Sequence, residues 1–428
     1  MAGKFDPVPG TGDIWEPEAS EWVFLENAAR DVFQTYSYAE LRTPVMERTE
    51  LFVRGIGEDT DVVQKEMYSF EDRGGRSLTL RPEGTAGVIR AIANAGLNPG
   101  EEKRIFYNGP MFRGEKPASG RRRQFHQVGV EAVGSANPFV DAESILMLLH
   151  YLDRVGVTNR RLLLNTRGLP EERKSVEDVL SGYFSPYTDQ LCADCQRRLQ
   201  TNVWRILDCK NEGCQPIIKQ APVISDYLSQ ESRQFFSDVC DALSRVGVEY
   251  EIAPRLVRGL DYYQHTVFEV IHDGLGAQDA IAGGGRYRLN VPGLKKPLEG
   301  VGFAAGTERL IMARQHEGQY QPARMGPDVY LANLMEGAIP EGLALAEKLR
   351  NAGWRVYAET ENKSLKAQMR KADKLGAMVA VIRGEEEVNR GVVTCRDLTS
   401  SEQTECTEAT LHQWLEQHVA GAVGTAAC

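Results

Sequence analysis

The fold is decided by residues 104–134, which read RIFYNGPMFRGEKPASGRRRQFHQVGVEAVG. Two strand-like segments, Arg104–Arg113 and Phe125–Gly134, flank a basic loop that contains glycine and proline. Apolar and aromatic residues alternating with polar ones, on either side of such a loop, are typical of paired strands. We therefore predict a long antiparallel hairpin.

The loop of this hairpin, residues 113–123, carries five basic residues against one acid. Such a density of charge suits a polyanion, which could be a nucleoside triphosphate, an RNA end or both. A solvated basic loop without a ligand would have the same composition. The loop alone therefore leaves both interpretations open.

Side chains alternate along a strand, so Phe125, Gln127, Gly129, Glu131 and Val133 share one face of the second strand. At ~3.4 Å per residue, Gln127 and Glu131 lie about 13 Å apart along the chain. Two polar groups on an otherwise apolar face could bracket a small bifunctional ligand. The alternative is the exposed face of an edge strand.

Glycines interrupt two further strand-like runs, Ala282–Tyr287 and Gly300–Gly306. Glycine within a strand usually marks a bulge or the close approach of a ligand or another backbone. After the second run, a helix is expected over Thr307–Gln315. It would place Arg309 in its first turn, beside backbone N–H groups that favour anions.

Helical spacing of apolar residues predicts helices in the first half of the chain, and short apolar runs predict strands around them. The expected helices are Glu18–Tyr36, Thr85–Ala95 and Asp141–Val155, and the expected strands are Met67–Phe70, Leu78–Leu80, Arg255–Ile271 and Asp279–Asn290. Thr43–Val45 is expected to be extended because a proline follows Thr43. Between about 170 and 230 no strand alternation is visible, so we predict a helical insertion.

The segment from Gln321 to Pro327 contains two prolines and a glycine and is predicted to be a linker. Strand-like and helix-like segments then alternate up to Val419, which indicates a compact α/β domain. The domains expected are residues 1–325, including the insertion, and residues 326–420. A disordered tail is expected over 421–428.

The composition is that of a water-soluble globular protein, with 428 residues of which 42% are hydrophobic and 26% charged. No signal peptide or membrane-spanning run is visible, so a cytoplasmic protein without a membrane partner is expected. The net charge of −10 means that contacts with nucleic acid must depend on local basic patches.

Together these segments resemble class II aminoacyl-tRNA synthetases, whose three signature motifs occur here in order. Arg42–Val45 resembles the first motif, Arg104–Gly134 the second and Gly302–Arg309 the third. The segments Leu256–Tyr263 and Ala282–Tyr287 resemble the two peptides peculiar to histidyl-tRNA synthetases, and Arg81–Thr85 fits the same family.

The resemblance implies a catalytic domain built on an antiparallel sheet with flanking helices, followed by an α/β anticodon-binding domain. It implies that L-histidine is joined to tRNA(His) through a histidyl-adenylate, with ATP as substrate, Mg²⁺ as its companion ion and a homodimer as the assembly. It assigns Arg258 to the substrate carboxylate and the α-phosphate, and Arg113 to the same phosphate. It assigns Arg113, Arg121 and Arg309 to ATP. It assigns the histidine pocket to Glu83, Thr85, Gln127, Glu131, Tyr262 and Tyr263.

Contacts with tRNA are expected in two places. Lys116 and Arg122 lie in the hairpin loop, where the family meets the acceptor end. Lys363, Lys366, Arg370 and Lys374 follow one another at spacings of three, four and four, which predicts a basic stripe on one helix face. An ordinary solvated helix face is the alternative.

Two positions depart from the family's pattern. Arg122 stands where many relatives carry an aromatic residue, and Arg288 follows Tyr287 where an aspartate is usual. Tyr287 could line the histidine pocket or pack behind the glycine-rich strand.

Four of the eight cysteines lie within the predicted insertion, as Cys192-x-x-Cys195 and Cys209-x4-Cys214. In a chain without secretory features, such cysteines are free thiols or metal ligands rather than disulfides. One close pair suits zinc and the other is loosely spaced. Both a structural zinc site and free thiols remain open, and no metal is assigned to catalysis.

Two other kinds of protein compete with this interpretation. A non-catalytic histidine-binding paralogue, such as the regulatory subunit of ATP phosphoribosyltransferase, should lack the anticodon domain and Arg258 or the motif arginines. A synthetase for another amino acid is disfavoured by the segment Arg258–Tyr263. A scaffold that only binds RNA would not need Glu83, Gln127 and Glu131 together.

Overall fold

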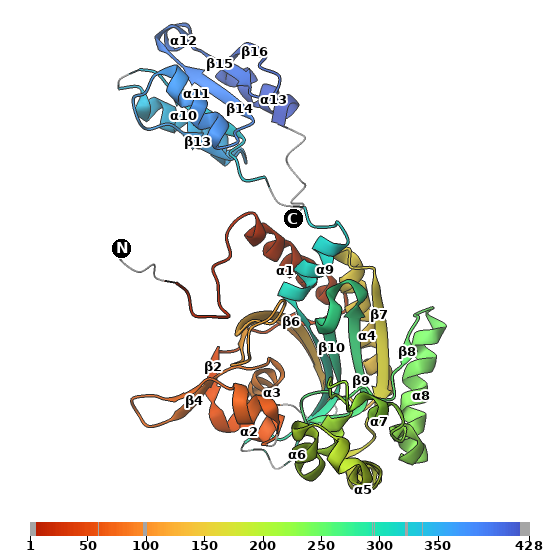
Figure 1. Cartoon of the computed structure of the whole chain (residues 1–428). Coiled ribbons are helices and arrows are strands. Elements are labelled where there is room, and N and C mark those ends of the chain that lie inside the picture. Colours follow the sequence, from red (N-terminus) through yellow and green to blue (C-terminus); the bar gives the residue numbers. More distant parts are fainter. Residues whose placement is uncertain are drawn as a thin grey trace. The chain divides into compact units, whose positions relative to one another are not determined.

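The structure is a computed structural model that describes residues 6–58, 60–96, 101–292, 294, 296–321, 324–335 and 337–419. The expected tail over 421–428 lies outside these residues. The chain divides into two compact units, the first ending at Gln321 and the second formed chiefly by the residues that follow (Figure 1). Among the described residues, no helix is both long and apolar enough to cross a membrane.

The first unit is built on an eight-stranded sheet. Its strands, in spatial order, are β1 (Ala39–Glu40), β5 (Lys103–Phe112), β6 (Gln124–Val133), β11 (Leu298–Gly306), β10 (Ala280–Leu289), β9 (Tyr263–His272), β7 (Arg160–Thr166) and β8 (Glu251–Ile252). The six central strands are antiparallel to their neighbours, and only the two short edge strands pair in parallel.

The predicted hairpin is present as β5 and β6, with Lys103 opposite Val133 and Phe112 opposite Gln124. The expected alternation is also confirmed. Val128 and Val130 point into the main core, while Gln127 and Glu131 line a cavity on the opposite face. The two faces of the same strand therefore serve packing and binding separately.

Helices cover both faces of the sheet. The main core lies between the sheet and α1 (Glu18–Thr35), α4 (Pro138–Arg154), α8 (Gln230–Arg245) and α9 (Thr307–His316). A second core, on the cavity side, includes α2 (Thr49–Ile56) and α3 (Thr85–Ala95), the latter with the bounds predicted from sequence. Beside them lie the π-helical turn η1 (Val62–Glu66) and a small sheet of β2 (Met46–Arg48), β4 (Ser77–Leu80) and β3 (Ser69–Glu71).

Residues 170–229 contain helical elements and no strand. In chain order they are η2 (Pro170–Glu172), α5 (Arg173–Phe184), η3 (Ser185–Gln190), α6 (Ala193–Thr201), η4 (Val203–Ile206), α7 (Gln215–Lys219) and η5 (Ile224–Tyr227). These elements share a core of their own that includes Phe184, Trp204 and Ile206. One residue from outside, Val257, is buried in that core and ties the insertion to the chain that follows it.

The second unit is a five-stranded sheet with the order β13-β12-β14-β15-β16, covered by helices. Its elements are β12 (Val329–Asn333), α10 (Ile339–Asn351), β13 (Val356–Ala358), α11 (Leu365–Lys374), β14 (Val379–Arg383), α12 (Glu385–Arg390), β15 (Val392–Asp397), β16 (Gln403–Thr407) and α13 (Glu408–Val419). The first three strands in chain order are parallel, and the last two return antiparallel.

One expectation needs correction, and several elements were not expected. The strand expected over Arg255–Ile271 begins only at Tyr263. The residues before it bond to loops rather than to a neighbouring strand, since the Asn165 amide donates to the carbonyl of Leu256 at 2.9 Å and the Asp261 N–H donates to Ile56. Strands β1, β2, β7, β8 and β16 and helices α2, α8 and α12 were not predicted.

A buried ion pair fastens α4 to the sheet. Arg286 on β10 donates to Asp141 at 2.6 Å, and the two side chains are 1% and 0% exposed. The same guanidinium donates to the carbonyls of Ser135 and Asn137, so its donors are satisfied inside the protein. Burying charges is tolerated only with such complete pairing.

We expect Asp141→Ala to reduce the free energy of unfolding of the first unit by about 3–5 kcal/mol, because it leaves the Arg286 charge buried without its partner. Urea denaturation followed by circular dichroism measures the change. The control is Asp178→Ala, which removes an exposed ion pair with Lys174 and should leave the midpoint in place. Equal midpoints for both variants would show that the buried pair does not stabilise the fold.

Candidate active site

Two joined cavities open on the face of the large sheet that carries Gln127 and Glu131. The inner cavity is lined by Glu83, Thr85, Tyr107, Arg113, Gln127, Glu131, Arg258, Leu260, Tyr262, Tyr263, Gly283, Tyr287, Gly302, Phe303 and Ala304. The outer cavity shares Arg113, Gln127 and Arg258 with it and extends to Arg121, Arg122 and Arg309. The residues assigned to histidine and to ATP from sequence are thus brought together in two adjoining spaces.

Glu131 lines the inner cavity and is 1% exposed. The hydroxyl of Thr85 donates to its Oε1 at 2.7 Å. Desolvation raises the pKa of Glu131 to about 8. A Cβ on the neighbouring Gly302 would lie 2.1 Å from Glu131 Oε2, so only glycine leaves room for this carboxyl group.

Several buried polar atoms in the inner cavity have no hydrogen-bond partner among the described residues. They are Gln127 Oε1, Glu131 Oε2 and the Tyr287 hydroxyl. Leaving such atoms unpaired costs free energy, and in native proteins they are usually satisfied by a ligand or by water. The cavity is therefore suited to a small ligand with polar groups at more than one position.

Glu83 closes the same cavity at the start of α3. Its two carboxylate oxygens accept the backbone N–H groups of Thr85 at 2.7 Å and Ala86 at 2.8 Å, and the Tyr262 hydroxyl donates to it at 3.4 Å. Desolvation raises the pKa of Glu83. The carboxylate is held rigidly by the helix end, and its remaining lone pairs are available to a cationic group.

Arg258 occupies the junction of the two cavities. It pairs with Glu269 on β9, and a Cβ on Gly283 would lie 2.7 Å from its Nη1. Glu269 and Gly283 are direct partners in the β9–β10 ladder, so the sheet register places the carboxylate and the space for the guanidinium side by side. Desolvation opposes the charge, but Glu269 raises the pKa of Arg258 and keeps it cationic.

The outer cavity is bordered by arginines of the hairpin loop and of α9. Arg113 donates to the carbonyl of Pro82 at 2.9 Å and lies over the Phe125 ring at 5.3 Å. Arg121 pairs with Glu115, and Arg309 donates to the carbonyl of Gly120 at 3.1 Å. These contacts hold the cations around a space suited to phosphate groups.

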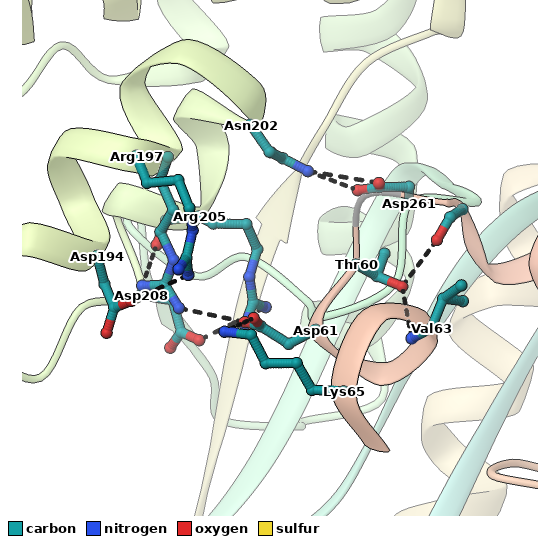
Figure 2. A network of polar contacts seen from close by, with 12 residues as sticks. Thr60, Asp61, Val63, Lys65, Asp194, Arg197, Asn202, Arg205, Asp208 and Asp261 are labelled. Atoms are coloured by element: carbon teal, nitrogen blue, oxygen red, sulfur yellow. Dashed lines mark hydrogen bonds and ion pairs between the residues drawn. The ribbon is translucent and has the colours of Figure 1, made fainter. Parts of the chain in front are cut away.

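The insertion contacts the loop from Arg258 to Tyr263 at Asp261 (Figure 2). Asn202 donates to Asp261 at 3.1 Å, next to Tyr262 of the inner cavity. Arg205 contacts Asp61 at 3.6 Å and lies against Gly259, where an added Cβ would be 3.0 Å from its guanidinium. The position of the loop thus depends on residues that are distant in the sequence.

The residues assigned to tRNA lie outside the inner cavity. Arg122 borders the outer cavity, and Lys116 is exposed on the hairpin loop. In the second unit, Lys366, Arg370 and Lys374 are exposed on α11, as predicted. Lys363 precedes this helix and pairs with Glu361, so the expectation that all four lie on one helix was wrong for Lys363.

Sequence reasoning missed two site residues. Tyr107 lines the inner cavity and lies directly opposite Gly129 in the hairpin. Applying the alternation rule to β5 as well as β6 would have found it. Glu269 had no local signal, because its role depends on the register between β9 and β10, which are joined through residues without a strand pattern.

An antiparallel sheet with a long basic hairpin, a glycine-lined cavity and an arginine in the first turn of the helix after the last strand are features of class II aminoacyl-tRNA synthetases. Comparison with known families gives a more specific assignment. The histidyl-tRNA synthetase family model matches residues 10–310, and an anticodon-binding domain model matches residues 328–418. The chain belongs to the histidyl-tRNA synthetase family.

Individual relatives match over nearly the whole chain. A histidine–tRNA ligase of Halothermothrix orenii is 46% identical over 412 residues, covering 96% of this chain and 98% of the relative. A histidine–tRNA ligase of Bacillus subtilis is 45% identical over 401 residues, covering 92% of this chain and 95% of the relative.

Solved structures agree. Apo histidyl-tRNA synthetase from S. aureus superposes with a TM-score of 0.79 at 33% identity, covering 96% of this chain and 100% of that one. A protein from Bacillus halodurans, described as an ATP phosphoribosyltransferase regulatory subunit/histidyl-tRNA synthetase, superposes with a TM-score of 0.59 at 18% identity. The match covers 87% of this chain and 97% of that one. The second likeness shows a common fold alone.

The raised pKa of Glu131 predicts a pH dependence of stability in the ligand-free protein. Below pH about 4.5 the carboxyl is protonated in both the folded and the unfolded chain. Between that value and about 8 only the unfolded chain loses its proton, so the contribution of Glu131 to stability falls as pH rises. Glu131→Gln keeps the acceptor for Thr85 and cannot ionise. The melting temperature of this variant, relative to that of the wild type, should therefore rise from pH 5 to pH 8. A difference in melting temperature that stays the same over this range would contradict the raised pKa of Glu131.

Proposed function

We propose that this protein joins L-histidine to tRNA(His) in two steps, with ATP as the energy source. In the first step a carboxylate oxygen of histidine attacks the α-phosphorus of ATP, and the bond to pyrophosphate breaks. In the second a ribose hydroxyl of the tRNA end attacks the histidyl carbonyl, loses its proton and releases AMP. Family membership supports this activity, and the two joined cavities support its chemistry.

The inner cavity is proposed to hold histidine. Glu83, fixed at the start of α3, faces the ammonium group together with Thr85 and Gln127. Glu131 and Tyr263 pair with the two imidazole nitrogens, and Tyr262 and Tyr287 line the pocket. A site that pairs both ring nitrogens leaves its own buried groups unsatisfied with other amino acids, which gives strong discrimination.

The observation that carries the proposal is the position of Arg258 where the two cavities meet. A guanidinium at this point can contact the carboxylate of histidine and the α-phosphate of ATP at once. It then stabilises the charge that develops as the new bond forms, with Arg113 acting on the same phosphate. Positioning and charge stabilisation are what phosphoryl transfer chiefly demands of a protein.

The outer cavity is proposed to hold ATP, with Arg309 stacked on the adenine and Arg121 at the outer phosphates. Mg²⁺ is proposed to accompany the nucleotide. The carboxylates of Glu115, Glu269 and Glu308 border this cavity and are the oxygen ligands that suit this ion. Bound there, the ion would neutralise charge on the phosphates.

The second unit is proposed to bind the anticodon of tRNA(His) through Lys366, Arg370 and Lys374, with Lys363 at the edge of the patch. Lys116 and Arg122 are proposed to meet the acceptor end. The stripe on α11 supports this, because an acidic protein needs local cations to bind RNA.

A homodimer is also proposed, formed through the first motif at Arg42–Val45. The small sheet beside that motif supports this assignment, because Val45, Met46 and Phe70 are exposed there. Apolar side chains gathered at a surface are a common feature of interfaces between subunits.

Histidine-dependent exchange of pyrophosphate into ATP tests the first step. We expect Arg258→Ala to reduce the exchange rate by about 10²–10³-fold, because the variant loses one of the two guanidinium groups that stabilise the developing charge. The matched control is Arg197→Ala, an exposed arginine of the insertion that pairs only locally with Asp194 and should keep the wild-type rate. A folded wild-type protein that binds histidine without exchange would favour the regulatory paralogue instead.

Neutralising the stripe tests the role of the second unit. We expect the combined variant Lys366→Gln, Arg370→Gln, Lys374→Gln to raise KM for tRNA. For the wild type, we expect log KM for tRNA to rise linearly with the logarithm of the salt concentration. The slope of this line should be smaller in the variant by roughly one unit for each phosphate group that it no longer binds. Pyrophosphate exchange should remain at the wild-type rate.

The control for this experiment changes Lys348→Gln and Arg350→Gln, which are exposed on α10 of the same unit. It should leave KM for tRNA unchanged. A stripe variant with normal KM for tRNA would show that another surface reads the RNA.

A further inference from the structure

The insertion brings four cysteines together from two separate turns. Cys192 and Cys195 begin α6, whereas Cys209 and Cys214 flank the turn between η4 and α7. Their four sulfur atoms all lie within 4.8 Å of one another. Cys195 and Cys214 are fully buried, Cys209 is 6% exposed and Cys192 is partly buried.

The spacing of the sulfur atoms fits a tetrahedral metal site. Zinc binds thiolate sulfur at about 2.3 Å, which puts any two sulfurs of a tetrahedron about 3.8 Å apart. Cys192 Sγ and Cys209 Sγ are separated by 3.8 Å. A disulfide would need about 2.05 Å, and all four thiols are free.

Backbone N–H groups point at two of these sulfurs. The N–H of Cys192 donates to Cys214 Sγ at 3.2 Å, and the N–H of Asn211 donates to Cys209 Sγ at 3.4 Å. Hydrogen bonds to an ionised acceptor are stronger than those to a neutral one, so these donors are placed to orient and stabilise sulfur ligands bound to a metal ion. The first of them crosses between the two turns, so the cluster is already organised around a common centre.

We propose that Cys192, Cys195, Cys209 and Cys214 bind one structural Zn²⁺. Four protein ligands complete a tetrahedral coordination shell and leave no open position for a substrate, so this metal has no catalytic role. The four thiols release their protons when the ion binds.

The insertion has good reason to need such a cross-link. It consists of short helices and turns around a small core of its own, without a strand between residues 170 and 229. A core of this size supplies little stability, and small domains commonly depend on a metal or disulfides. The proposed ion would join α6 to the turn before α7 at the centre of that core.

The cross-linked segment is one of the parts of the insertion that contact the active-site loop. Between Cys195 and Cys209 lie Arg198, Asn202 and Arg205, which contact Asp61 or Asp261 (Figure 2 shows Asn202 and Arg205). Zinc would therefore hold the insertion in the conformation that supports the loop from Arg258 to Tyr263. Its loss should loosen this loop without removing any group from the two cavities.

Metal analysis of the full-length protein, purified without chelators from zinc-supplemented cells, tests the proposal. We expect about one zinc per chain, as a four-cysteine site requires. Cys214→Ser should lose that zinc, whereas Cys240→Ser, a partly buried cysteine on α8 outside the cluster, should retain it. A protein without bound zinc, or with zinc retained equally in both variants, would overturn the assignment.

A second measurement on the wild-type protein does not depend on the variants folding. Replacement of the metal by Co²⁺ should give the intense sulfur-to-cobalt charge-transfer absorption of a tetrahedral thiolate site. Removing the metal should increase hydrogen exchange in residues 192–214 and in the loop Arg258–Tyr263. Finding the four cysteines in disulfides, or free and equally reactive with and without added Zn²⁺, would refute the site.

Discussion

The contact of the Arg258 guanidinium with Gly283 and its ion pair with Glu269 organise the active site. A partly desolvated cation is stable only with a partner of opposite charge, and the β9–β10 ladder supplies Glu269 directly opposite the glycine that leaves room for Arg258. Because β10 pairs antiparallel with β11, and β11 in turn with β6, the same sheet fixes Gln127 and Glu131 relative to this arginine. One pattern of strand pairing thus determines where the two cavities join.

Much of this arrangement could be predicted from the sequence. The hairpin, its alternation and the helix Thr85–Ala95 follow local periodicity, and local patterns were sufficient to find them. The candidate residues came mainly from resemblance to a family, and the structure gathers those expected to meet histidine in one cavity. Glu269 and the contacts of Asn202 and Arg205 were not predictable, because each depends on pairing between segments distant in the chain. The loop before Tyr263 was mistaken for a strand because its apolar residues, Val257 among them, pack against the insertion instead of a neighbouring strand.

The insertion is connected to the active site through the loop that it contacts. It adds no side chain to the two cavities, yet it contacts the loop next to Tyr262 through Asn202 and Arg205. A subdomain with so small a core can hold a loop in place only if its own helices are fixed. The four clustered thiols, bound to the proposed zinc ion, would fix them, and cysteines remote from the chemistry would then act on it through the loop.

The proposed chemistry requires that one arginine, at the junction of two cavities, contacts both the amino acid and the nucleotide. A crystal structure with a non-hydrolysable histidyl-sulfamoyl adenosine is the decisive experiment. We expect the imidazole between Glu131 and Tyr263, the adenosine in the outer cavity and the sulfamoyl group within hydrogen-bond distance of Arg258. An analogue bound with its imidazole outside the inner cavity, or with Arg258 still turned to Glu269 and away from the linker, would contradict this role.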